Sequence, residues 1–307
     1  ELIKKVEDTG AHGFELNFGC PHGMTERGMG AAVGQDPEIA CMVVEWVMEK
    51  ATIPVITKLT PNVHSVVPTG RSVVKAGSNG LSLINTIQSV TGVDLDSFVP
   101  NPYVGGKSVF GGYCGPAVKP IALKMLTTIA QDDLTSKVPI SGIGGVSTWK
   151  DAVEFMLLGA SNVQVCTAAM HHGFRIVEDM AEGLNNWMNE KGFKKLTDFI
   201  GKSVPTVTHW EDLDINYHHV AQINQEKCIH CGLCYIACED TSHQSINLEK
   251  GMPYNTYTIK EEECVGCNLC QLVCPVDNCI TMEERRVAPE YINWVEWQKR
   301  GLPLNDH

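Results

Sequence analysis

The residues with the clearest chemistry are eight cysteines that lie between Cys228 and Cys274. They form two runs of the pattern C-x2-C-x2-C-x3-C, and the second run repeats the first after a constant interval. This pattern typically binds two 4Fe–4S clusters, with three cysteines of one run on a cluster and the fourth on the other cluster. We therefore predict two clusters, whose ligands are Cys228, Cys231, Cys234 and Cys274 for cluster 1 and Cys264, Cys267, Cys270 and Cys238 for cluster 2.

The alternative interpretation of these cysteines is a pair of zinc sites. Structural zinc sites use four ligands each, but a doubled triplet spacing is not a zinc pattern. Cys279 lies outside both runs, and we interpret it as a packing thiol. Two clusters carry single electrons and catalyse nothing by themselves, so another site must supply those electrons and a further one must use them.

Composition limits the possible partners of the chain. It has 307 residues, a net charge of −12 and 43% hydrophobic residues. A general nucleic-acid binder would normally be basic, so we expect no nucleic-acid partner. No run approaches the roughly 20 apolar residues of a membrane helix, and no signal peptide is visible. Clustered rather than scattered cysteines favour metal in a reducing compartment, so we expect a cytoplasmic protein without a membrane partner.

Upstream of the cysteine runs, short apolar segments alternate with helical stretches. The apolar segments lie at 14–18, 53–58, 81–85, 138–142 and 162–165. This alternation predicts an α/β fold with a buried parallel sheet. Five strand–helix units fall short of the eight, in about 250 residues, of a (β/α)8 barrel. Either the sheet is open, or the first three units precede Glu1; because the chain opens inside an apparent helix, we expect an upstream part to be missing.

Polar residues or glycines follow every predicted strand, as the active-site face of a barrel requires. They are Asn17 and Cys20, Lys58, Asn85 and Thr86, Gly144 and Gly145, and Cys166 and Thr167. The GIGG and CTA segments each precede a helix and suit a phosphate held by backbone N–H groups. Each motif alone is weak, but their joint placement predicts a phosphate-bearing cofactor. FMN fits, because it collects single electrons and passes on a hydride.

At this point the chain resembles a known family. The segments ELNFGCPHGMTERGMGAAVGQDPE, KLTPNV, INT, FGGYCGPAVKP, GIGG and QVCTA resemble the dihydroorotate/dihydropyrimidine dehydrogenase flavoproteins. The fused two-cluster ferredoxin-like segment narrows the resemblance to NAD-dependent dihydropyrimidine dehydrogenases. It implies a truncated FMN-binding TIM-barrel part over 1–205, a linker over 206–220, an α+β two-cluster ferredoxin-like domain over 221–283 and a C-terminal extension over 284–307.

The resemblance also implies roles for individual residues. Cys20 is similar to the catalytic general acid of the family. The segment TERGMG at 25–30, together with His22 before it, is similar to a mobile active-site lid. The positions similar to pyrimidine-binding residues are Asn17, Asn85 and Thr86. The positions similar to FMN-binding residues are Asn17, Lys58, Gly115, Gly144, Gly145, Cys166 and Thr167. One departure stands beside the acid, where Gly19 replaces the serine that many family members carry.

The implied reaction is reduction of the ring double bond of uracil or thymine. No dinucleotide-binding fingerprint is present, so the resemblance implies a partner subunit that binds FAD and NADH, in a heterotetramer. Electrons would pass from NADH through FAD, the clusters and FMN. Two alternatives remain open: a dihydroorotate dehydrogenase-like enzyme, and an electron-transfer protein whose truncated barrel is not functional.

Overall fold

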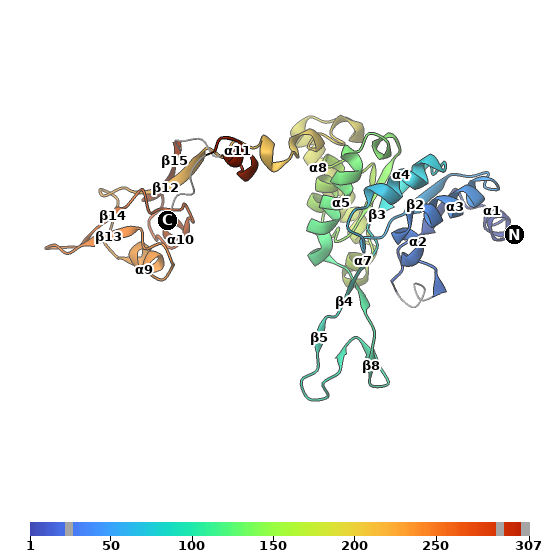
Figure 1. The fold of residues 1–307 in the computed structure, drawn as a ribbon, viewed down its shortest axis with the longest axis horizontal. Helices are drawn as coiled ribbons and strands as arrows, with labels where there is room; N and C mark the ends of the chain where they lie inside the picture. Colours follow the sequence, from blue (N-terminus) through green and yellow to red (C-terminus); the bar gives the residue numbers. More distant parts are fainter. Residues whose placement is uncertain (22–26, 287–291, 302–307) are drawn as a thin grey trace. The chain divides into compact units, whose positions relative to one another are not determined.

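The computed structural model describes residues 1–21, 27–286 and 292–301. The chain divides into two compact units, Glu1–Val207 and Thr208–His307 (Figure 1). Within the described residues, no helix is both long enough and apolar enough to cross a bilayer.

The first unit is built on a parallel five-stranded sheet of order β1-β2-β3-β10-β11. Its strands are β1 (Phe14–Asn17), β2 (Val55–Lys58), β3 (Gly80–Leu83), β10 (Ile140–Ile143) and β11 (Asn162–Gln164). They coincide with the five apolar segments, and β3 is buried along its whole length, as expected for a sheet covered on its faces. The predicted α/β class with a parallel sheet is therefore present.

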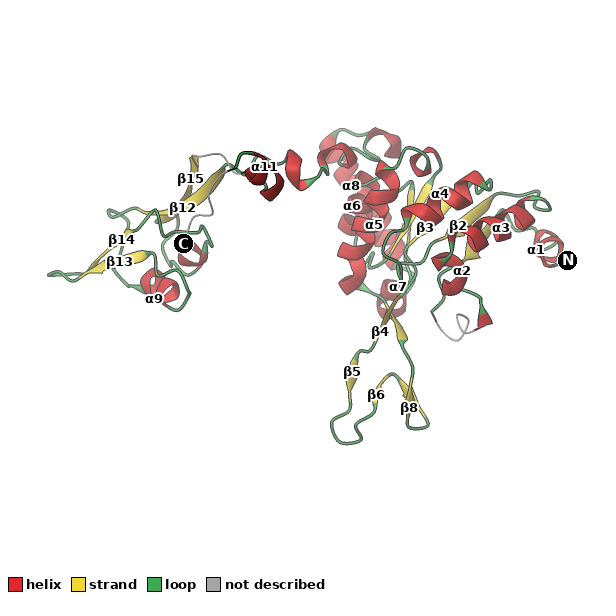
Figure 2. Cartoon of the chain, viewed as in Figure 1, coloured by secondary structure: helices red, strands yellow, loops and turns green. Residues whose placement is uncertain are grey.

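Helices alternate with the strands along the chain (Figure 2). They are α1 (Leu2–Glu7), α2 (Ala31–Gln35), α3 (Pro37–Met48), α4 (Val67–Lys75), α5 (Lys119–Gln131), α6 (Trp149–Leu157), α7 (Thr167–His172) and α8 (Ile176–Lys191). Helix α5 packs against β3 and β10, and α6 packs against β11 and α8. The core between them includes the fully buried Leu81, Leu83, Leu126 and Phe155.

The helix starts have local causes. Asp36 caps α3 by accepting hydrogen bonds from the N–H groups of Glu38 and Ile39, and Pro37 occupies the first helical position. Thr148 and Asp151 form a reciprocal capping box at the start of α6. These caps set where each helix leaves the end of the preceding strand, and so they fix the loops that carry the polar residues.

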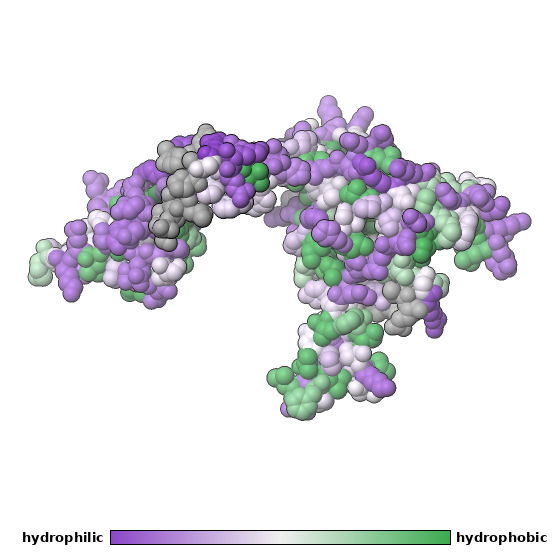
Figure 3. Space-filling model, viewed as in Figure 1, coloured by the Kyte–Doolittle hydropathy of each residue, from purple (hydrophilic) through white to green (hydrophobic). Residues whose placement is uncertain are grey.

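An arm of short strands interrupts the alternation between β3 and α5 (Figure 1). It contains β4 (Ile87–Ser89), β5 (Gly92–Val93), β6 (Pro100–Asn101), β7 (Tyr103–Val104), β8 (Lys107–Ser108) and β9 (Gly111–Tyr113), paired antiparallel as β4–β9, β5–β6 and β7–β8. Apolar side chains gather on it (Figure 3), and Leu95, Phe98 and Val104 are each at least 80% exposed. The arm returns to the sheet through a 3-10 turn at Pro116–Val118.

The second unit repeats one small motif twice. Its elements are β12 (Tyr217–Ile223), α9 (Leu233–Glu239), β13 (Ile246–Glu249), β14 (Thr256–Ile259), α10 (Leu269–Leu272), β15 (Ile280–Arg286) and α11 (Trp294–Lys299). β12 pairs antiparallel with β15, and β13 pairs with β14. Each cysteine run passes through a loop into a short helix, α9 or α10, and the core of the unit is largely cysteine and isoleucine.

Candidate functional site: a strand-end cavity and two cysteine pockets

The carboxyl ends of the parallel strands surround a cavity of about 150 Å³, which we call the strand-end cavity. Its walls come from the ends of β2, β3, β10 and β11 and from the turn before α5. The lining residues are Lys58, Ile84, Asn85, Thr86, Cys114, Gly115, Val118, Ile143, Gly144, Gly145, Val146, Ser147, Gln164, Cys166, Thr167 and Ala168. All the residues proposed from sequence to contact FMN lie here except Asn17, together with Asn85 and Thr86.

Two glycines of the cavity wall require their residue type. Gly144 and Gly145 have φ values of +132° and +79°, a region that glycine adopts freely and other residues do not. A Cβ on Gly145 would lie 2.8 Å from the carbonyl oxygen of Gly115, and one on Gly144 would lie 2.8 Å from the Cβ of Ala122. Both glycines line the cavity, so backbone atoms form this part of its wall, which suits a phosphate group held by N–H donors.

Lys58 belongs to a charged group inside the sheet. Its Nζ lies 3.4 Å from Oε1 of Glu15, whose Oε2 accepts a hydrogen bond from Nε2 of Gln164 at 2.8 Å. Burial alone would raise the pKa of Glu15, but the Gln164 hydrogen bond and the Lys58 charge outweigh it and hold that pKa below its usual value. Glu15 is therefore ionised at neutral pH and anchors the Lys58 ammonium at the cavity.

Asn17 reaches the strand-end cavity through Asn85. Nδ2 of Asn85 donates to Oδ1 of Asn17 at 2.8 Å, while Oδ1 of Asn85 accepts the N–H of Thr86 at 2.8 Å. Gly19 allows this arrangement, because a Cβ there would lie 2.5 Å from the Cβ of Asn85. The glycine that departs from the family pattern is thus a close-approach position in this chain.

Cys20 does not line the cavity. It is half-buried beyond the end of β1, and its carbonyl oxygen accepts the N–H of Ala31 at 3.1 Å. Residues 22–26, which include His22 and the first part of the predicted lid, lie outside the described residues. The described structure therefore places Cys20 after the same strand as Asn17 and shows no contact between it and the cavity.

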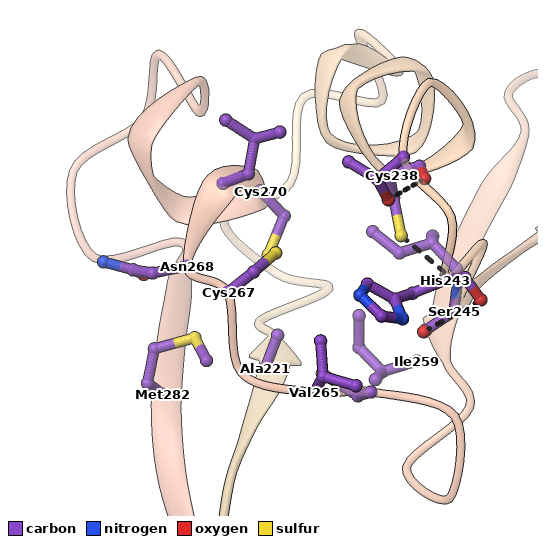
Figure 4. A pocket seen from close by; sticks show the side chains of 14 residues that line it. Ala221, Cys238, His243, Ser245, Ile259, Val265, Cys267, Asn268, Cys270 and Met282 are labelled. Carbon is purple, nitrogen blue, oxygen red and sulfur yellow. Dashed lines mark hydrogen bonds between the residues drawn. The ribbon is translucent and has the colours of Figure 1, made fainter.

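In the second unit, the eight cysteines separate into two pockets. One is lined by Cys228, Cys231, Cys234 and Cys274, the other by Cys264, Cys267, Cys270 and Cys238. Each pocket thus contains three cysteines of one run and the last cysteine of the other, which is the crosswise grouping that the spacing predicts. Figure 4 shows Cys238 facing Cys267 and Cys270 across the second of these pockets.

The donor set of the pockets fits a cluster better than a single ion. All the cysteines are free thiols, and among the described residues no three His, Cys, Asp or Glu side chains converge closely enough for one metal ion. A cluster instead separates its thiolates around several irons. Backbone N–H groups already point at two sulfurs: Ser245 donates to Cys238 at 3.2 Å and His230 to Cys228 at 3.4 Å. Such bonds stabilise thiolate charge.

Burial controls the ionisation of the innermost thiols. It raises the pKa of Cys234 and of Cys270 to about 11 in each case. Both thiols are protonated at neutral pH when no metal is bound, so cluster binding must release their protons. Cys279, which we interpreted from the sequence as a packing thiol, lines the first pocket together with Cys228 and Cys274.

Sequence reasoning missed several residues of the strand-end cavity. Cys114 lines it and accepts a hydrogen bond from Oγ1 of Thr167 at 3.3 Å. The sequence could have indicated Cys114, because it lies within the FGGYCGPAVKP segment that resembles the family. Gln164, which also lines the cavity, was missed as well, and so was Glu15, to which Gln164 donates a hydrogen bond.

Comparison with known proteins identifies the family. The dihydroorotate dehydrogenase family model matches residues 1–188, and the 4Fe-4S dicluster domain model matches residues 221–282. The chain is 42% identical over 246 residues to the NAD-dependent dihydropyrimidine dehydrogenase subunit PreA of Escherichia coli K12, covering 80% of this chain and 60% of PreA.

Two further relatives have similar sequence identity to this chain. The chloroplastic dihydropyrimidine dehydrogenase (NADP(+)) of Arabidopsis thaliana is 44% identical over 216 residues, covering 69% of this chain and 51% of the relative. The catalytic subunit of dihydroorotate dehydrogenase B (NAD(+)) of Pyrococcus furiosus is 43% identical over 202 residues, covering 65% and 63%. The chain thus spans between about half and two thirds of each relative's length. It belongs to the dihydroorotate dehydrogenase family, and a 4Fe-4S dicluster domain follows the dehydrogenase domain in its sequence.

Proposed function

We propose that this chain is the FMN- and iron–sulfur-binding part of an NAD-dependent dihydropyrimidine dehydrogenase, which reduces the ring double bond of uracil or thymine. One observation carries the proposal: the strand-end cavity gathers the cation Lys58, the amide Asn85 and the open backbone of Gly144 and Gly145 at one place. The two cysteine pockets supply the second half of the argument, because a flavin can exchange single electrons with clusters.

The residues present suit FMN. The bare backbone at Gly115, Gly144 and Gly145, with Cys166 and Thr167, would hold the phosphate end, and Lys58 would place its positive charge toward the ring. When bound, FMN would supply the hydride for one carbon of the pyrimidine ring.

Cys20 would supply the matching proton. A protonated thiol can donate its proton to the neighbouring ring carbon. Asn17, Asn85 and Thr86 would orient the pyrimidine, since an amide offers both a donor and an acceptor to its alternating C=O and N–H edge. The hydride and the proton together complete one reduced C–C bond, and Cys20 is reprotonated from solvent.

The proposed electron route needs a partner. Electrons would enter from NADH through a separate FAD-binding subunit, pass through the two clusters and reach FMN. We further propose that the five-stranded sheet is part of a (β/α)8 barrel, that 206–220 links it to the cluster domain, and that the assembly is a cytoplasmic heterotetramer.

Dihydroorotate dehydrogenase activity is the second candidate, favoured by the Pyrococcus relative. Orotate carries a carboxylate and needs a cation to receive it. Among the described residues that line the cavity, Lys58 is the only cationic side chain, and Glu15 already neutralises it. The charge balance of the cavity therefore supports a neutral pyrimidine.

The test compares uracil, thymine and orotate as acceptors. The chain is reconstituted with FMN, iron and sulfide, and it is assayed with NADH in the presence and absence of an FAD-containing reductase subunit. We expect turnover with uracil or thymine and only with the reductase present. Turnover with orotate alone would favour the second candidate, and NADH oxidation without the reductase would refute the partner. Clusters without any bound flavin would indicate an electron-transfer protein.

A further inference from the structure

The loop at residues 144–148 is held from behind by one buried carboxylate. Oδ2 of Asp151 accepts the N–H of Ser147 at 2.9 Å, the N–H of Thr148 at 2.8 Å and the hydroxyl of Thr148 at 3.0 Å. Asp151 is only 9% exposed. The same loop presents Gly144, Gly145 and Ser147 to the strand-end cavity, so the position of this carboxylate determines the shape of that wall.

Lys119 fixes the carboxylate in turn. Its Nζ donates to Oδ1 of Asp151 at 2.7 Å and to Oε2 of Glu154 at 2.8 Å. These bonds, that to Asp151 foremost, raise the pKa of Lys119. Burial alone would raise the pKa of Asp151, but the Lys119 hydrogen bond and the loop N–H groups outweigh it and lower that pKa. The two groups are therefore charged together over the whole neutral range.

Lys119 directly follows the segment that forms the other cavity wall. It is the first residue of α5 and follows the turn at Pro116–Val118, which is preceded by Gly115. The two walls touch, because a Cβ on Gly145 would lie 2.9 Å from the Cβ of Lys119 and 2.8 Å from the Gly115 carbonyl oxygen. The Lys119–Asp151 pair thus clamps the 144–148 loop onto the segment that carries Gly115 and Val118.

We propose that Lys119 and Asp151 are positioning residues that hold the two walls at the spacing required by the phosphate end of the flavin. The inference rests on the proposed flavin site. Neither residue lines the cavity, and two carboxylates already engage the Lys119 ammonium. Lys119 therefore acts through the backbone of the loop and not as a phosphate ligand.

The experiment measures FMN affinity rather than turnover. Lys119→Met and Asp151→Asn are made in the full chain, and the dissociation constant for FMN is measured from the quenching of flavin fluorescence. Loss of a cap-like interaction behind the loop should weaken FMN binding by on the order of tenfold in Lys119→Met. Lys119→Arg, which keeps the charge, should restore most of the affinity. Asp151→Asn keeps an acceptor for the loop and tests the charge separately if Lys119→Met folds poorly.

Arg71→Met is the matched control. Arg71 donates to Asp132 at 2.6 Å, and Asp132 accepts the N–H groups of Leu134 and Thr135. The Arg71–Asp132 pair therefore holds a loop of the same unit in the same way, but that loop does not line the cavity. We expect Arg71→Met to lower the melting temperature while leaving FMN affinity unchanged.

The outcomes separate the two levels of the proposal. Weaker FMN binding in Lys119→Met but not in Arg71→Met supports the positioning role. Equal affinities of wild type and Lys119→Met, or an equal loss in Lys119→Met and Arg71→Met, would overturn that role while the flavin site stands. A wild-type chain that binds no FMN would overturn the proposed flavin site itself, and the positioning role with it.

Discussion

Gln164 on the last strand of the sheet donates a hydrogen bond to Glu15 on the first strand, with 2.8 Å between Nε2 and Oε2. Three strands lie between them, and neighbouring strands are about 4.8 Å apart, so a flat sheet would separate its edges by about 19 Å. The contact therefore requires a strongly curved sheet whose side chains converge on the concave face. This curvature supports the proposed barrel and brings Glu15 within reach of Lys58.

That relationship predicts an acid-sensitive contribution to stability. The pKa of Glu15 lies below its ordinary value of 4.5, so the folded state binds fewer protons than the unfolded state. The stabilisation is present above the ordinary pKa and is lost as pH falls through the lowered pKa. The urea concentration at the unfolding midpoint should fall less steeply with decreasing pH below about pH 4.5 in Glu15→Gln than in the wild type. Glu182→Gln, on the exposed face of α8, is the control; an unchanged acid limb in Glu15→Gln would contradict the prediction.

Gly19 should tolerate no side chain. A Cβ would lie 2.5 Å from the Cβ and 2.6 Å from Nδ2 of Asn85, so Gly19→Ser should displace the Asn85 amide from Asn17. Because small misplacements of binding groups are costly, we expect turnover with uracil to fall by about tenfold to a hundredfold. Gly92→Ala, where a Cβ meets nothing within 4 Å, should keep wild-type turnover. Wild-type turnover in Gly19→Ser would show that Asn85 does not orient the substrate.

Cys20→Ala tests the proton donor. Removal of a general acid typically costs 10²–10⁴-fold, so we expect turnover to fall by about that much while reduction of the flavin by the partner proceeds at the wild-type rate. Stopped-flow absorbance separates these two steps. Cys41→Ala, another half-buried thiol on α3, is the control. Equal turnover in Cys20→Ala and Cys41→Ala would exclude Cys20 as the acid.

Cys274 and Cys279 line the same pocket, yet we expect only Cys274 to bind iron. Cys274→Ser should lose about half of the bound iron and one of the two cluster signals in electron paramagnetic resonance, because cluster 1 would lack a ligand. Cys279→Ser should keep both clusters and lower stability slightly, as expected of a buried packing thiol. Loss of a cluster in Cys279→Ser, or its retention in Cys274→Ser, would show that Cys279 is the ligand.

Much of the architecture could be predicted from local signals. The cysteine spacing indicates a dicluster domain, which the domain match confirms, and the apolar segments coincide with the strands. The convergence of the residues that follow β2, β3, β10 and β11 could be predicted because the carboxyl ends of parallel strands share one edge. The Lys119–Asp151 clamp could not be predicted, since its partners lie 32 positions apart and each reads alone as an ordinary surface charge.

The sequence by itself determined which residues are available: eight cysteines in two interleaved runs, and a set of strand ends rich in glycine, amide and thiol groups. These features depend on the spacing of residues along the chain, which determines directly which side chains lie on the same loop or at the same edge of a sheet. Only the tertiary structure decided which of these groups contact one another. The curvature that joins Glu15 to Gln164, the close approach of Gly19 to Asn85, and the clamp on the 144–148 loop depend on packing between distant segments. Such contacts arise from the shape of the whole core and leave no local pattern in the chain.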